Sequence, residues 1–272
     1  MKKINLILII LLSLVILVML GWYLVYQLIL PMPEILELIP GAPLAYINVL
    51  NLEDNLSAVQ TSDFLHRAST SPLWEEVKLS DLWQRLSAQK SYWEQRMAID
   101  RENIIRLTKK NALLALYSGK DPGNFLLISE VDVIARTIVL SGSTEKTLAS
   151  LYEFSKEKYR GIKLMTVKDP AWTISYGFIG RAGLLGSDVS LLKKTIDIYK
   201  GNEQGLADTP GFKELIADLP GSDISFYVNA ANIRRTYRLS ASSSTSRYLA
   251  SAIKDVDAWV GTVTSQSGIL RL

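Results

Sequence analysis

The chain has 272 residues, with 30 Lys and Arg against 27 Asp and Glu, one His and no Cys. The lack of Cys excludes disulfides, thiolate metal sites, cysteine nucleophiles and a lipidated export signal. A single His, His66, excludes any site built on two imidazoles, and the near balance of charges carries no nucleic-acid signature. We therefore expect no cofactor, no metal ion and no nucleic-acid partner.

The first predicted element is a membrane anchor. An uncharged apolar run extends from Leu6 to Leu30. As a helix of about 25 residues it would measure roughly 37 Å, enough to cross a hydrocarbon core of about 30 Å. A cleaved signal peptide has a shorter apolar region, about 7–15 residues, followed by a small-residue cleavage motif, which this run lacks. Residues 6–30 are therefore expected to contact the lipid bilayer as an uncleaved transmembrane helix.

The flanks of this run predict its orientation. Lys2 and Lys3 precede it, and flanking positive charge tends to stay in the cytoplasm. Trp22, Tyr23 and Tyr26 would then form an aromatic belt at the outer membrane surface. We expect residues 1–31 to be a cytoplasmic stub and anchor in a bacterial cytoplasmic (inner) membrane, 32–39 a linker, and 40–272 a periplasmic or extracellular domain.

The apolar period changes repeatedly along this domain, as in a mixed fold. Residues 44–49 read as a strand and 53–110 as helical. Residues 112–117 and 125–131 flank a turn-rich segment and predict a hairpin. A second helical stretch follows, chiefly over residues 144–159, where Leu148, Leu151 and Phe154 keep helical spacing.

The second half of the domain continues with a predicted meander of residues 162–167, 172–179 and 184–185. Ser187 or Asp188 is expected to cap a helix that runs to Lys200. Residues 210–219 read as a short helix, 224–228 as a strand, and the last fifteen or so residues as a closing hairpin. Strands joined by tight turns, with helices inserted in blocks, predict an α+β fold with mainly antiparallel sheet.

Two similar phrases stand far apart in this pattern, "AYINVLNL" at Ala45–Leu52 and "FYVNAANI" at Phe226–Ile233. Residues two apart in a strand share a face, so each Tyr and the following Asn should point the same way. We interpret both phrases as corners between a strand and a helix, with Asn51 and Asn232 as helix N-caps. The alternative interpretation makes the Tyr and Asn pairs a ligand grip.

The same corners carry a family resemblance. The N-terminal span is followed by the motifs "LAYINV", "SPLW", "LLGS", "LADTPGFKEL" and "LPGSDISFYVN". This order, over residues 38–235, resembles the bacterial exported family catalogued as domain of unknown function thirty-three fifty-two. The resemblance implies a membrane-anchored envelope protein without an assigned activity, and it supplies no catalytic residues.

Enzymatic motifs are weak in this sequence. Ser190 and Lys193, followed later by Tyr227 and Asn229, mimic two of the three signatures of penicillin-binding proteins, but the third signature is missing after Asn229. His66 alone does not make a catalytic triad, because a lone His on a helix is more often a packed or surface residue. We therefore expect a non-enzymatic binding or scaffolding module. The alternative is an exported hydrolase whose site no motif reveals.

One candidate binding surface comes from the C-terminal basic residues. The set consists of Arg234, Arg235, Arg238 and Arg247. Arg234 and Arg238 are one helical turn apart and would share a face. An ordinary solvated face explains such a cluster; the functional interpretation is a contact with an anionic partner, either anionic lipid or another envelope protein.

Overall fold

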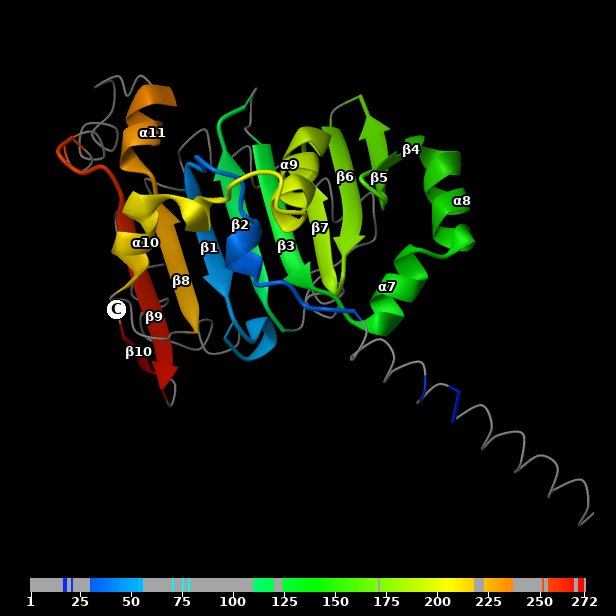
Figure 1. Cartoon of the computed structure of the whole chain (residues 1–272), viewed down its shortest axis with the longest axis horizontal. Coiled ribbons are helices and arrows are strands. Elements are labelled where there is room, and N and C mark those ends of the chain that lie inside the picture. Colours follow the sequence, from blue (N-terminus) through cyan, green and yellow to red (C-terminus); the bar gives the residue numbers. More distant parts are fainter. Residues whose placement is uncertain are drawn as a thin grey trace, which may run out of the picture.

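The computed structural model describes residues 17–18, 21, 30–55, 70, 75, 78, 110–119, 124–170, 172–217, 223–236, 251, 254–266 and 269–271. Its centre is one antiparallel sheet of ten strands in the order β10-β9-β8-β1-β2-β3-β7-β6-β5-β4 (Figure 1). The strands are β1 (Ala45–Val49), β2 (Ala112–Tyr117), β3 (Asn124–Glu130), β4 (Glu153–Tyr159), β5 (Ile162–Asp169), β6 (Trp172–Ile179), β7 (Ala182–Gly186), β8 (Ile224–Val228), β9 (Trp259–Gln266) and β10 (Ile269–Arg271).

Helices stand between the strands in blocks, so the expected α+β class with antiparallel sheet is confirmed. The α-helices are α7 (Val133–Val139), α8 (Gly142–Leu151), α9 (Val189–Tyr199), α10 (Pro210–Ala217) and α11 (Ala230–Thr236). Two 3₁₀ helices, η1 (Ile35–Leu38) and η2 (Leu206–Asp208), join them. Figure 1 shows α9 and α10 in front of the sheet and α7 and α8 at its β4 end.

The main core lies between one face of the sheet and the layer of η1, η2, α9 and α10. It contains Tyr46, Leu113 and Ala115 from the central strands, and Leu192 and Ile196 from α9, all buried. The α9 residues recur at helical spacing, which turns one stripe of the helix toward the sheet. A second, smaller core lies on the opposite face. Its buried members are Met165, Val167 and Tyr176, with residues of α7 and α8 packed against them.

The residues that precede the sheet differ from the expected linker at 32–39. Ile35, Leu38 and Ile39 are buried in the main core. The Leu206 amide donates to the Ile39 carbonyl at 2.8 Å, and Pro40 forms an isolated β-bridge with Gly205. The local sequence around residues 32–39 does not reveal this packing, because the apolar partners of these residues come from helices more than 150 residues later. The domain therefore begins at about residue 32.

Most of the predicted strands are confirmed. The hairpin of β2 and β3, the meander of β5, β6 and β7, the strand β8 and the closing hairpin of β9 and β10 all occur. The predicted cap of α9 is also confirmed, since the Asp188 carboxylate accepts from the Ser190 amide at 2.8 Å. The predicted helical residues 53–110 lie outside the described residues, apart from 53–55, 70, 75, 78 and 110.

The predicted helix over residues 144–159 is wrong in its second half. Helix α8 ends at Leu151, and residues 153–159 form the edge strand β4. The spacing of Leu148, Leu151 and Phe154 suits a helix, but Phe154 packs against the second core from a strand that pairs with β5. Charged side chains occupy most of β4, as is common on an edge strand. They obscure the alternation of polar and apolar residues that would indicate a strand.

The two similar phrases form neighbouring antiparallel strands, with Tyr46 directly opposite Tyr227. Their rings stack with centroids 5.6 Å apart, and Phe212 of α10 lies edge-on to both. The predicted cap at Asn232 is wrong: the Asn229 side chain accepts from the Asn232 amide at 2.8 Å, so Asn229 caps α11. Asn51 lies immediately before a helical turn, as predicted, and has a φ of 47°. Its backbone amide donates a hydrogen bond to the Asn111 side chain.

Candidate functional site

The point where the N-terminal run meets the domain has a defined structure. The Arg181 amide, in the turn between β6 and β7, donates to the Pro31 carbonyl at 3.2 Å. The preceding Gly180 has φ of 55°, and a Cβ built there would lie 2.1 Å from the Pro31 oxygen. Only glycine accepts this backbone conformation and this approach together. The chain is therefore held at the β6–β7 turn one residue after the apolar run ends.

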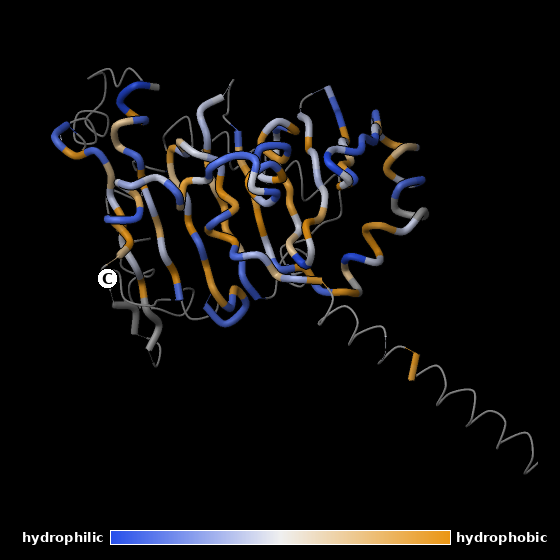
Figure 2. Tube along the Cα trace, viewed as in Figure 1, coloured by the Kyte–Doolittle hydropathy of each residue, from blue (hydrophilic) through white to orange (hydrophobic). Residues whose placement is uncertain are grey.

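Helix α7 contacts the same turn. The Arg136 guanidinium donates to the Gly180 carbonyl and lies 5.3 Å from the centre of the Phe178 ring. Ala135 faces inward and is buried, and Val139 packs against the second core. Ile138 of α7, and Leu140 just after its end, are exposed. Figure 2 shows that α7 is largely hydrophobic, with one hydrophilic interruption.

Charges near this turn are paired. Glu130, at the end of β3, accepts from Lys110 at 3.1 Å and lies 3.5 Å from Arg181. Together with the bond from Arg136 to Gly180, these contacts tie β3, the turn and α7 into one corner of the molecule. We call Pro31, Arg136, Ile138, Leu140 and Gly180 the anchor corner. The predicted meander already required a turn between residues 179 and 184, whereas the contact of this turn with Pro31 has no local signal.

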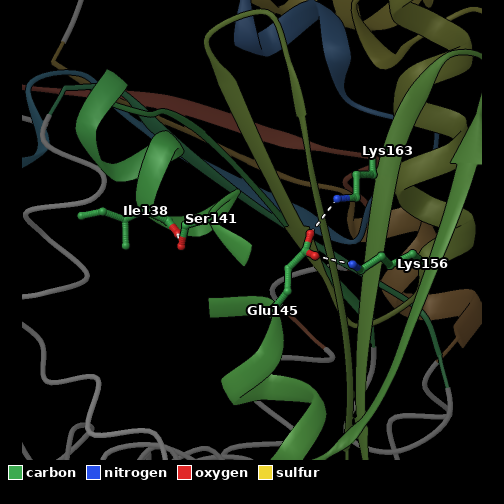
Figure 3. A network of polar contacts seen from close by, with 5 residues as sticks. All are labelled: Ile138, Ser141, Glu145, Lys156 and Lys163. Carbon is green, nitrogen blue, oxygen red and sulfur yellow. Dashed lines mark hydrogen bonds and ion pairs between the residues drawn. The ribbon is translucent and has the colours of Figure 1, made fainter. Parts of the chain in front are cut away.

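A second cluster joins α8 to the edge of the sheet (Figure 3). The Glu145 carboxylate lies between the ammonium groups of Lys156 and Lys163, with Lys163 at 2.6 Å. Hydrogen bonds from Lys156 and then Lys163 lower the pKa of Glu145. Burial, and then the charge of Glu145, raise the pKa of Tyr176 to about 12. The cluster favours the charged form of Glu145 and the neutral form of Tyr176, as expected of a structural ion-pair network.

An open depression of about 450 Å³ lies beside this cluster. Its lining residues are Ala149, Ser150, Leu151, Tyr152, Glu153, Lys168, Asp169 and Pro170. Lys168 and Glu153 lie 3.7 Å apart across it and are both exposed. Exposed, partnered charges in a wide depression are typical of ordinary surface rather than of an enclosed ligand pocket.

The predicted basic surface is only partly within the described residues. Arg234 and Arg235 lie on α11, whereas Arg238 and Arg247 lie outside the described residues. Arg234 donates to the Val256 carbonyl and pairs with Asp257 at 3.0 Å, so it holds α11 to the segment before β9. Arg235 is exposed. The structure thus gives Arg234 a structural role and leaves Arg235 available at the surface.

The residues of the penicillin-binding resemblance do not assemble. Lys193 pairs with Glu157 at 2.8 Å and lies over the Tyr159 ring. Ser190 is exposed in the first turn of α9, where its amide binds Asp188. Tyr227 is buried in the aromatic cluster with Tyr46 and Phe212. His66 lies outside the described residues.

The described residues contain neither a candidate metal site nor a candidate membrane span. No group of three or more His, Asp or Glu side chains there could hold a metal ion. None of the helices in that part of the chain is long and apolar enough to cross a membrane. The predicted anchor, residues 6–30, lies outside the described residues except for Leu17, Val18, Gly21 and Leu30.

Comparison with known proteins gives distant structural likeness alone. No family model matches the chain, and no curated protein matches it. Among solved structures, crystal form I of TP0453 is 10% identical, with a TM-score of 0.39, over 75% of this chain and 66% of that chain. Crystal form III is 10% identical, with a TM-score of 0.38, over 75% of this chain and 67% of that chain. Crystal form IV is 9% identical, with a TM-score of 0.36, over 73% of this chain and 65% of that chain. The chain therefore spans about two thirds of the TP0453 chain.

Proposed function

We propose that this protein is a single-pass membrane-anchored envelope protein of bacteria. Residues 6–30 cross the cytoplasmic membrane, the N-terminus is inside, and the α+β domain is outside, where it binds or scaffolds another envelope component. The observation that carries the proposal is the fixed position of Pro31: the apolar run ends one residue before a backbone bond to the β6–β7 turn. An anchor joined in this way presents the domain in one orientation rather than on a free tether.

The orientation of the domain narrows the choice of partner. Val228 pairs with Ala45 at the end of β8 that leads into α11, and Glu130 pairs with Ala182 beside the β6–β7 turn. Ala45 and Val49 are the two ends of the short strand β1. The pair of Val228 with Ala45 lies at one end of the strands, and the pair of Glu130 with Ala182 lies at the other, the Val49 end. Figure 1 shows α11 and the chain before η1 at opposite ends of the sheet. Exposed Arg235 therefore faces away from the anchor, which favours an acidic envelope protein over lipid of the same bilayer.

The anchor can be tested in cells with the full chain. A C-terminal reporter that works only after export should be active, and alkaline carbonate should leave the protein in the membrane fraction. Replacing Leu17 and Val18 together by Asp should abolish both results, since a charge at the centre of a span costs about 2.5–3.5 kcal/mol. The conservative pair Leu17→Val and Val18→Ile is the control. A cytoplasmic reporter signal, or extraction by carbonate, would refute the proposal.

The partner contact can be tested by photo-cross-linking from position 231 on α11 in intact membranes. If Arg235 contacts an acidic protein, Arg235→Glu should reduce the protein adduct and Arg235→Lys should keep it. Asp257→Asn is the matched control, because it removes the partner of Arg234 without changing the arginines. An adduct with lipid, or an adduct insensitive to Arg235→Glu, would contradict the acidic-protein assignment.

A further inference from the structure

The side chains of α7 suggest how the domain meets the bilayer. Ile138 is 58% exposed, although aliphatic side chains of a short helix usually face the core. Figure 3 shows Ile138 pointing away from Glu145 and its two lysines, hence away from the ion-pair network that joins α8 to the sheet. The inner side of α7 is already occupied by the second core, so Ile138 belongs to a separate surface.

The anchor corner sets the position of this surface. Arg136 of α7 donates to the Gly180 carbonyl, and Gly180 touches Pro31, so one residue links the outer end of the apolar run to α7. The side-chain bond from Arg136 to Gly180 and the neighbouring backbone bond from Arg181 to Pro31 leave little freedom between α7 and the end of the apolar run. If residues 6–30 cross the membrane, the turn and α7 must lie at its outer surface.

We propose that α7 lies in the headgroup region of the bilayer and inserts Ile138 among the lipids. This inference rests on the proposed function, because it needs the anchor. An interfacial helix buries its apolar side about 5–10 Å into the boundary of headgroups and acyl chains. Arg136 stays at the polar side, where its guanidinium binds the Gly180 carbonyl.

Hydrophobic contact, rather than net charge, drives this insertion. Glu130 is paired with both Lys110 and Arg181 beside the turn, so two positive charges and one negative leave only +1 among these three side chains. A contact of this kind should not require anionic lipid, unlike a polybasic surface, whose binding weakens with salt. The lipid that covers α7 is therefore expected to be any bilayer-forming phospholipid, zwitterionic lipid included.

The chain contains no Cys, so single cysteines can report the depth of chosen positions in the full-length protein. Ile138→Cys tests the inference, Val18→Cys reports the anchor, and Leu215→Cys is the matched control. Leu215 is an aliphatic residue, 39% exposed, on α10 at the other side of the sheet. Each variant carries an environment-sensitive fluorophore and is reconstituted into phosphatidylcholine vesicles. Iodide quenches from water, and nitroxide lipids quench from shallow or deep positions.

We expect the Val18→Cys probe to be quenched by deep nitroxides and the Ile138→Cys probe by shallow ones. Iodide should quench the Ile138→Cys probe about threefold less than the Leu215→Cys probe, as burial at the headgroup boundary requires. The pattern should persist when phosphatidylglycerol or salt is added. If the Val18→Cys probe is not quenched by lipid, the proposed anchor fails. If lipid quenches the Val18→Cys probe, but iodide quenches the Ile138→Cys probe as strongly as the Leu215→Cys probe, this inference alone is overturned.

A second variant separates lipid from protein cover and guards against misfolding. With the probe at exposed Thr137→Cys, Ile138→Glu should reduce shallow lipid quenching, whereas Leu215→Glu should leave it unchanged. Circular dichroism of both variants checks the fold. Protection of the Ile138→Cys probe from iodide without any lipid quenching would mean that a second copy or another protein covers α7, which also overturns the proposal.

Discussion

Strands β2 and β5 belong to one sheet, but they differ in how far the side chains on their two faces are buried. In β5 the consecutive residues Leu164 and Met165 are both fully buried, one in each core. In β2 Leu113 is fully buried, whereas Leu114 and Leu116, on the opposite face, are 37% and 46% exposed. Both strands carry aliphatic side chains on both faces, a pattern usual for strands covered on both sides. Among the described helices, α7 and α8 pack against the second face only near β4 to β7. Burial on that face is thus decided by where helices reach.

The largest expected effect tests this difference within one strand. Leu113→Ala removes a fully buried side chain and should lower the free energy of unfolding by about 2–5 kcal/mol. Leu114→Ala, one residue on and facing the other way, should cost less than about 1 kcal/mol. Urea unfolding of the two variants measures both values. Equal losses would break the comparison, since they would mean that Leu114 is covered as well as Leu113.

A smaller effect is expected at the anchor corner, which joins the β5 side of the sheet to the N-terminal chain. Gly180 and Gly201 both have positive φ, 55° and 71°, but only Gly180 faces another chain segment. Gly201→Ala should cost about 1 kcal/mol for the left-handed backbone. Gly180→Ala should cost about 1–2 kcal/mol more, because its Cβ collides with the Pro31 oxygen. Thermal unfolding compares the pair; equal melting temperatures would argue against a fixed Pro31.

The next effect sharpens the comparison at the β8 side of the sheet. Asn229→Ala removes the side chain that accepts from the Asn232 amide and should lower stability by about 1 kcal/mol. Asn232→Ala removes only a surface bond to the Ala42 carbonyl and should cost about 0.5 kcal/mol. Chemical unfolding distinguishes the two. The reverse order would restore Asn232 as the cap.

The smallest effect concerns the ion pairs that hold α8 over the β5 side. Because hydrogen bonds from Lys156 and Lys163 lower the Glu145 pKa below 4.5, the carboxylate adds stability above about pH 4.5. That contribution is lost as pH falls through the lowered pKa. Glu145→Gln should therefore lower stability slightly at pH 7, change little at pH 3, and so flatten the acid limb of the stability curve. Unfolding measured from pH 7 to pH 3 checks this, and an unchanged acid limb would show that the cluster does not contribute.

Local sequence determined much of the fold. The apolar runs of β2 and β3, the turn-forming residues between strands and the cap at Asp188 all act within a few residues, so the antiparallel sheet and α9 were predictable. The turn at Gly180 and Arg181 was predictable for the same reason. Its role at the anchor corner was not, because Pro31 lies about 150 residues earlier in the chain.

Tertiary structure decided what local patterns leave open. Residues 32–39 look like a linker until α9 and η2 supply their apolar partners, and residues 153–159 look helical until β5 supplies a pairing strand. Arg234 looks like a binding residue until Asp257 is folded against it. The sequence of the apolar strand β2 does not indicate which of its faces a helix will cover. Side chains alternate between two equivalent faces, and only packing distinguishes them.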